Sequence, residues 1–117
     1  MSVTPLPTEA REVPLACVPG AIPAAERASH FARLTRLFTT GLRERAEIPG
    51  GYAFRFDADA FDELARWVAL ERRCCPFLAV GVQLTPDGGP LRVRLTGPAG
   101  TREFLAAELP APAGPAR

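Results

Sequence analysis

The sequence predicts an α+β fold in which one antiparallel sheet of four or five strands carries helices on one face. Two observations support this fold class. Apolar residues alternate with polar ones in two pairs of short segments, and each pair is joined by a Pro/Gly-rich turn. Between and around these pairs, apolar residues recur every three or four positions, as they do in helices. Short turns imply antiparallel pairing, so the expected element order is (β)α-ββ-α-ββ-α in two layers.

The first elements are an optional strand and a helix. Val13 to Val18 could form a short strand, which Pro19-Gly20 would end. Pro23 suits the first turn of a helix, and Gly41 is a plausible stop for it. One stripe of this helix would carry Arg27, His30, Phe31, Leu34, Leu37 and Phe38.

A hairpin and the central helix follow. Residues 42–48 and 52–56 alternate as strands on either side of the turn Pro49-Gly50-Gly51. Asp57 or Asp59 then caps a helix. This helix should end at about Cys74, because Pro76 disfavours a helical conformation at Cys75. Its broad apolar face would carry Phe61, Leu64, Trp67, Val68, Glu71, Cys74 and Cys75.

The last part of the chain repeats the hairpin pattern. Residues 78–84 and 91–96 alternate as strands around the turn at 85–90. Gly97-Pro98 breaks the second strand, and residues 101–109 form a short helix. The 117-residue length suits a single domain. We place that domain at residues 14–109, between a tail at 1–13 and a Pro/Ala-rich tail at 110–117.

Composition excludes several classes of function. The net charge is only +1, although all fourteen basic residues are arginine. A mainly electrostatic nucleic-acid binder would show a basic excess. No apolar run approaches the roughly 18 residues that cross a bilayer, and residues 1–14 lack the apolar core of a secretory signal. The sequence therefore predicts a cytoplasmic protein that binds neither nucleic acid nor membrane.

The three cysteines are the unusual chemical feature. Cys74 and Cys75 are adjacent, and an odd number of cysteines does not form a disulfide framework. Because Pro76 places the pair across a helix end, both sulfurs could converge on one point. A helix C-terminus disfavours a thiolate, which argues against a fast nucleophile. A metal ion, in contrast, displaces the thiol proton itself.

This pattern predicts a site for a soft metal or metalloid ion. Cys74 and Cys75 would be ligands, with Cys17 as a third, and His30 could complete a tetrahedral Cys₃His zinc site. Thiolates select Zn and Cu(I) over Mg and Ca. Three thiolates without a fixed fourth ligand would also suit Hg(II) or As(III).

Glu71 is a further candidate, as a ligand or as a partner behind the ligands. It lies three residues before Cys74 and is the charged member of an apolar stripe. A buried carboxylate is costly unless it is paired or ligating. Its partner could be a metal, a backbone N–H, or an arginine at the rim. The arginine reading, with Arg43, Arg45 or Arg55 as the partner, is the more common arrangement.

The same residues are compatible with two other functions. The cysteines could simply be packed in a structural or interaction module, for example a homodimer. Alternatively, the protein could be a thiol redox enzyme in which Cys75 attacks and Cys74 or Cys17 resolves. The sequence favours ion binding over both of these functions. It contains no recognised catalytic motif, and we therefore expect a binding protein and not an enzyme.

The segment Glu71-Arg-Arg-Cys-Cys-Pro-Phe-Leu78 resembles a signature, E-R-x-C-C-P-F-L, of a group of small bacterial proteins, most of them uncharacterised. The resemblance extends over residues 14–109. It includes Ala16-Cys17, Glu26-Arg-Ala-Ser-His30, the GYAFRF run at 51–56, and Leu-Thr-Gly-Pro-Ala-Gly at 95–100. Such proteins accompany heavy-metal resistance genes, so the resemblance implies a role in metal or thiol chemistry. It carries Cys17, His30, Glu71, Cys74 and Cys75 over as motif positions without assigning their roles.

Overall fold

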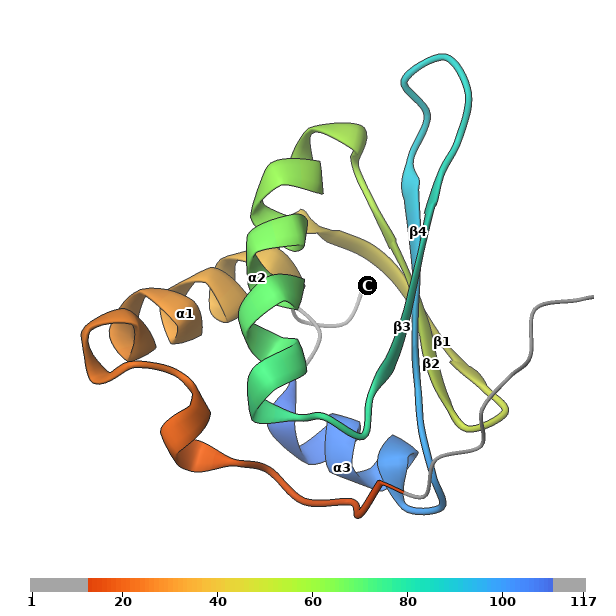
Figure 1. The fold of residues 1–117 in the computed structure, drawn as a ribbon. Coiled ribbons are helices and arrows are strands. Elements are labelled where there is room, and N and C mark those ends of the chain that lie inside the picture. Colours follow the sequence, from red (N-terminus) through yellow and green to blue (C-terminus); the bar gives the residue numbers. More distant parts are fainter. Residues whose placement is uncertain (1–12, 111–117) are drawn as a thin grey trace, which may run out of the picture.

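The computed structural model describes residues 13–110 of the chain. It confirms the α+β fold class, with four antiparallel strands in one sheet of order β1-β2-β4-β3. The helices lie on one side of that sheet (Figure 1). The strands are β1 (Leu42–Ile48), β2 (Gly51–Phe56), β3 (Ala79–Leu84) and β4 (Leu91–Thr96), and the α-helices are α1 (Ala24–Arg36), α2 (Phe61–Cys74) and α3 (Thr101–Glu108).

The two predicted hairpins meet in the middle of the sheet. β1 pairs with β2, β3 pairs with β4, and the central pairing joins β2 to β4. Both hairpin turns use left-handed backbone, with φ of +80° at Gly50 and +67° at Gly88. The inward faces of the two central strands are buried and carry Tyr52, Phe54, Phe56, Leu91, Val93 and Leu95.

The helices close the core from one side. Leu64 and Trp67 of α2 and Leu105 of α3 are buried against the sheet. A single π-helical turn, η2 (Leu37–Gly41), continues α1. It brings Phe38 into edge-on contact with Phe54, Phe56 and Trp67, at ring-centroid distances of 5.2, 5.4 and 5.1 Å. Such edge-to-face packing adds to the hydrophobic stabilisation of the core.

Two local expectations need correction, and a third lies outside the described residues. The optional strand at 13–18 does not form; this segment is irregular up to the short 3₁₀ turn η1 (Pro19–Ala21). One reason is that the Val18 N–H donates to a helix carbonyl, that of Cys74, instead of to a strand. Phe31 and Phe61, both expected on buried stripes, are 56% and 40% exposed. The tails predicted at 1–13 and 110–117 lie almost entirely outside the described residues.

Candidate metal centre

The three cysteines gather at the C-terminal end of α2. Cys74 is the last residue of that helix, and Cys75 leaves it with φ of −121° and ψ of 74°. This change of direction keeps the two neighbouring side chains from diverging as they would within a helix. With Cys17, the three Sγ atoms all lie within 4.8 Å of one another.

Cys17 reaches the cluster because its segment is attached on both sides. One residue after it, the Val18 N–H donates a 2.7 Å hydrogen bond to the Cys74 carbonyl. Two residues before it, Leu15 occupies the space that a Cβ at Gly100 would need, with its Cδ2 atom 2.7 Å from that position. The segment accordingly runs beside the C-terminal end of α2 and the start of α3 (Figure 1).

The loop after the pair is also held firmly. The Leu78 N–H donates to the Cys75 carbonyl at 3.1 Å. Phe77 is buried and meets Phe104 of α3 edge-on, with ring centroids 5.0 Å apart. Gly97 leaves room for this loop, since a Cβ there would lie 3.1 Å from the Phe77 carbonyl oxygen. These contacts fix the position of Cys75 relative to α3.

Behind the sulfurs runs a chain of hydrogen bonds. Cys17 Sγ lies 3.5 Å from Cys75 Sγ, and the Cys75 thiol donates to Glu71 Oε2 at 3.3 Å. The second carboxylate oxygen, Oε1, lies 3.0 Å from His30 Nε2. His30 is 1% exposed, and among the described residues its Nδ1 has no hydrogen-bond partner.

The expected arginine partner of Glu71 is therefore wrong. His30 occupies that place, because α1 packs against α2 and both side chains point into the contact. The three candidate arginines are engaged elsewhere: Arg43 with Asp57, Arg55 with Glu44, and Arg45 over the Tyr52 ring. His30 does not belong to the cluster of three sulfurs, so the expected Cys₃His ligand set does not form in this conformation.

The surroundings of Cys74 and Cys75 favour the protonated form of these two thiols. Burial, followed by the negative charge of Glu71, raises the pKa of Cys75 far above the usual range of a thiol. The same two causes, in the same order, raise the pKa of Cys74. Without a metal, these thiols are weak nucleophiles, which argues against the redox-enzyme hypothesis.

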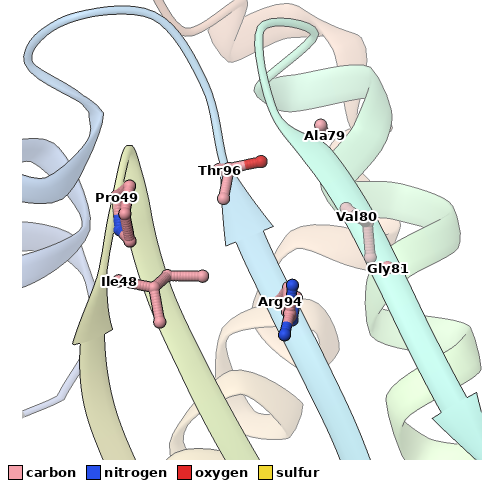
Figure 2. A pocket seen from close by; sticks show the side chains of 7 residues that line it. All are labelled: Ile48, Pro49, Ala79, Val80, Gly81, Arg94 and Thr96. Carbon is pink, nitrogen blue, oxygen red and sulfur yellow. The ribbon is translucent and has the colours of Figure 1, made fainter.

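Apart from the cysteine cluster, a hollow lies on the sheet face away from the helices (Figure 2). The hollow follows from the strand register, because Arg94 of β4 lies opposite Ala53 of β2 on one side and opposite Gly81 of β3 on the other. These small neighbours leave the area around Arg94 uncovered. The lining includes one charged side chain and no cysteine, histidine or carboxylate, so it offers no ligand set comparable to the cysteine cluster.

Comparisons with known proteins add no further constraint. No protein-family profile matches the chain, and no curated protein or solved structure matches it significantly. Within residues 13–110, no helix combines the length and the apolar character that crossing a membrane requires. The evidence for a function therefore lies in the geometry of the site itself.

Proposed function

We propose that this protein binds a soft metal or metalloid ion through the sulfurs of Cys17, Cys74 and Cys75. The observation that carries the proposal is the mutual distance of the three Sγ atoms, at most 4.8 Å. Metal–thiolate bonds are about 2.3 Å long, so two sulfurs on one ion lie no more than about 4.6 Å apart. Small side-chain rotations bring all three sulfurs within that limit.

The chemistry of the donors supports a soft ion. Thiolates favour ions such as Zn(II), Cu(I), Hg(II) and As(III) over Mg(II) and Ca(II). Access to the site is graded, because Cys75 is buried whereas Cys17 is solvent-accessible. An ion can therefore enter from the side of Cys17 and reach the adjacent pair. The sequence resemblance to proteins that accompany heavy-metal resistance genes supports the same class of ligand.

In this proposal Glu71 and His30 are not ligands but position the Cys75 sulfur through hydrogen bonds. The Glu71 carboxylate accepts the hydrogen bond of the Cys75 thiol and thereby orients its sulfur toward the other two. His30 in turn orients Glu71 through the other carboxylate oxygen. These contacts place the Cys75 sulfur in the protein without an ion, and the hydrogen bond to Glu71 is released when an ion displaces the thiol proton.

The test is a titration of the reduced protein with Zn(II), Cu(I), Hg(II) and arsenite, each monitored by competition with a chromophoric dithiol. The double variant Cys74→Ser/Cys75→Ser should lose at least about 100-fold in affinity for the ion that binds. Ala16→Ser, which changes the exposed neighbour of Cys17 and keeps every thiol, should bind as the wild type does. Equal affinities of the double variant and the wild type would refute the proposal.

A second candidate function is supported by strand β3. It is an edge strand of the sheet, and its Val82 and Leu84 side chains are 41% and 59% exposed. Exposed apolar residues on an unpaired strand edge are typical of an interaction surface, such as that of a homodimer. Sedimentation analysis of the wild type and of Val82→Thr/Leu84→Thr separates this function from ion binding, because these substitutions leave the cysteines untouched.

A further inference from the structure

We infer that the cysteine cluster selects a trivalent metalloid hydroxide, such as arsenous acid, over a divalent cation held by the same three sulfurs. This inference rests on the proposed function and names its ligand class. It follows from three features of the site: the number of sulfurs, the carboxylate in contact with one of them, and the burial of that sulfur.

Counting charges separates the two classes of ion. Three thiolates on a divalent cation leave one net negative charge, whereas three thiolates on As(III) leave none. Cys75 is 2% exposed, and its sulfur lies 3.3 Å from Glu71 Oε2. A negative complex in this place is both desolvated and next to a carboxylate, and each of these is unfavourable. The excess negative charge belongs to the divalent complex itself, so it is present in addition to the charge of Glu71.

The proton balance favours the same class. Arsenous acid reacts as As(OH)₃ + 3 R–SH → As(SR)₃ + 3 H₂O. In each of its steps an As–O bond breaks, an As–S bond forms, and the thiol proton leaves with the hydroxide as water. Arsenic stays trivalent, so no oxidant or reductant is needed. A divalent cation brings no hydroxide to take up the thiol protons, so these protons must leave a site in which Cys75 is buried and reach solvent.

Among the described residues, no arginine contact offsets the negative charge of a divalent complex. Arg72 and Arg73 lie in the last turn of α2, and both are exposed. Among residues 13–110, no arginine forms an ion pair with Glu71 or a hydrogen bond to a cysteine sulfur. The charged group that is hydrogen-bonded to the adjacent cysteine pair is the Glu71 carboxylate, whose Oε2 lies 3.3 Å from Cys75 Sγ. A site for a divalent thiophilic cation would gain from a positive side chain in this position, and within residues 13–110 no arginine is hydrogen-bonded to Glu71 or to a cysteine sulfur.

The test compares arsenite with Zn(II) on the reduced full chain, using equilibrium dialysis at one pH and one ionic strength. Arsenite should bind at least about tenfold more tightly than Zn(II). Glu71→Gln removes the charge and keeps the shape. It should raise Zn(II) affinity about tenfold relative to arsenite affinity, because both ions share any loss of sulfur orientation whereas the loss of the charge favours only the divalent complex. Tighter binding of Zn(II) than arsenite to the wild type, or equal shifts of both ions in Glu71→Gln, would overturn the inference.

A surface variant covers the case in which Glu71→Gln does not fold. Ala16 is exposed and adjacent to Cys17, so Ala16→Arg adds a positive charge at the entrance of the site without disturbing the core. It should raise Zn(II) affinity by about threefold and leave arsenite affinity unchanged. Ala107→Arg, on the exposed face of α3, is the matched control and should change neither. An equal gain for both ions in Ala16→Arg would also overturn the inference.

The outcomes distinguish this inference from the proposed function. If none of Zn(II), Cu(I), Hg(II) and arsenite binds, or if binding survives the loss of all three cysteines, the proposed function itself fails. If Zn(II) binds through the three cysteines more tightly than arsenite does, the proposed function stands and only the selectivity inferred here is wrong.

Discussion

At the scale of single residues, the pair His30–Glu71 sets the character of the site. A buried polar group is costly unless it is hydrogen-bonded, and the contact across the α1–α2 interface gives His30 Nε2 and Glu71 Oε1 a partner in each other. Glu71 also accepts the hydrogen bond of Cys75. The pair therefore links the packing of two helices to the orientation of one sulfur.

His30→Leu should destabilise the fold by about 2 kcal/mol, because it preserves most of the packing volume and leaves the Glu71 carboxylate without its partner. Urea unfolding measures the change. Phe31→Ser is the matched control on the neighbouring residue; Phe31 is 56% exposed, so its substitution should cost no more than about 0.5 kcal/mol. Equal costs for the two variants would show that His30 contributes no more than a surface residue.

The raised pKa of Cys75 predicts a stability that falls in alkaline solution. The folded protein keeps this thiol proton at a pH where the unfolded chain loses it, since burial and Glu71 raise the pKa only in the folded state. Above the ordinary thiol pKa of about 8.5, the unfolded state binds fewer protons. The free energy of unfolding should then decrease by up to about 1.4 kcal/mol per pH unit, and below that pH the full contribution is present.

Urea unfolding between pH 7.5 and 10 under reducing conditions measures this slope. Cys75→Ala should unfold with a shallower slope above about pH 8.5, whatever its absolute stability. Parallel slopes in the two proteins would contradict the prediction.

Sequence analysis at the residue scale identifies the right residue types but not all of their contacts. The proximity of Cys74 and Cys75 follows from their adjacency and from Pro76, which is local information. The partnership of His30 and Glu71 was not predicted, although each lies on the stripe of its helix expected to face the core. That shared position was the available signal, and only the packing of α1 on α2 turns it into a contact.

At the scale of elements, the segment before α1 determines whether the site has two sulfurs or three. It forms no strand, and its hydrogen bond from Val18 N–H to the Cys74 carbonyl replaces strand pairing. Carbonyls at a helix C-terminus lack partners within the helix, so the end of α2 is a natural attachment point. Sequence periodicity missed this because alternation at 13–18 is compatible with any extended segment.

Val18→Pro should therefore weaken ion binding by about tenfold or more while leaving the cysteines in place. Proline removes the N–H donor and fixes φ near −65°, whereas Val18 has φ of −114°. Val18→Ala retains the N–H and should bind the ion normally. The measurement is the affinity for the ion that the wild type binds most tightly. Wild-type affinity in Val18→Pro would show that the segment does not position Cys17.

The strands and helices themselves were largely predictable. Alternation at 42–48, 52–56 and 91–96 corresponds closely to β1, β2 and β4, because one face of each strand packs on the core or its rim. The order β1-β2-β4-β3 was not predictable. The order depends on whether β3 or β4 of the second hairpin pairs with β2 after the chain has passed through α2. No local sequence pattern specifies that choice.

The contact between β2 and β4 depends on glycine at the start of β2. A Cβ at Gly51 would lie 1.8 Å from the Leu95 carbonyl oxygen, whereas a Cβ at Gly20 meets nothing within 4 Å. Gly51→Ala should cost about 3 kcal/mol in unfolding free energy, since backbone at the sheet centre must move. Gly20→Ala, the control, should change it by no more than about 0.5 kcal/mol. A mild effect at Gly51, measured by thermal unfolding, would show that the strand start is pliable.

At the scale of the whole molecule, the site joins parts of the fold that are distant in the chain. Its sulfurs come from the segment before η1 and from the end of α2, and Glu71 connects them to α1 through His30. The neighbouring loop packs on α3 through Phe77 and Phe104. An ion bound here therefore connects the first segment to every helix on one side of the sheet.

Ion binding should accordingly stabilise the entire fold. An ion that binds only the folded state raises the unfolding free energy by about 2.7 kcal/mol at 100 times its dissociation constant, which corresponds to several degrees in Tm for a domain of this size. Thermal unfolding with and without the ion measures the shift, and Cys17→Ser/Cys74→Ser/Cys75→Ser should show none. Amide hydrogen exchange shows where the ion acts. Protection should increase in residues 14–18, because the ion links Cys17 to the end of α2, and it should stay unchanged in the hairpin turn at 85–90. A shift that persists in the triple variant would mean that the ion acts elsewhere on the protein.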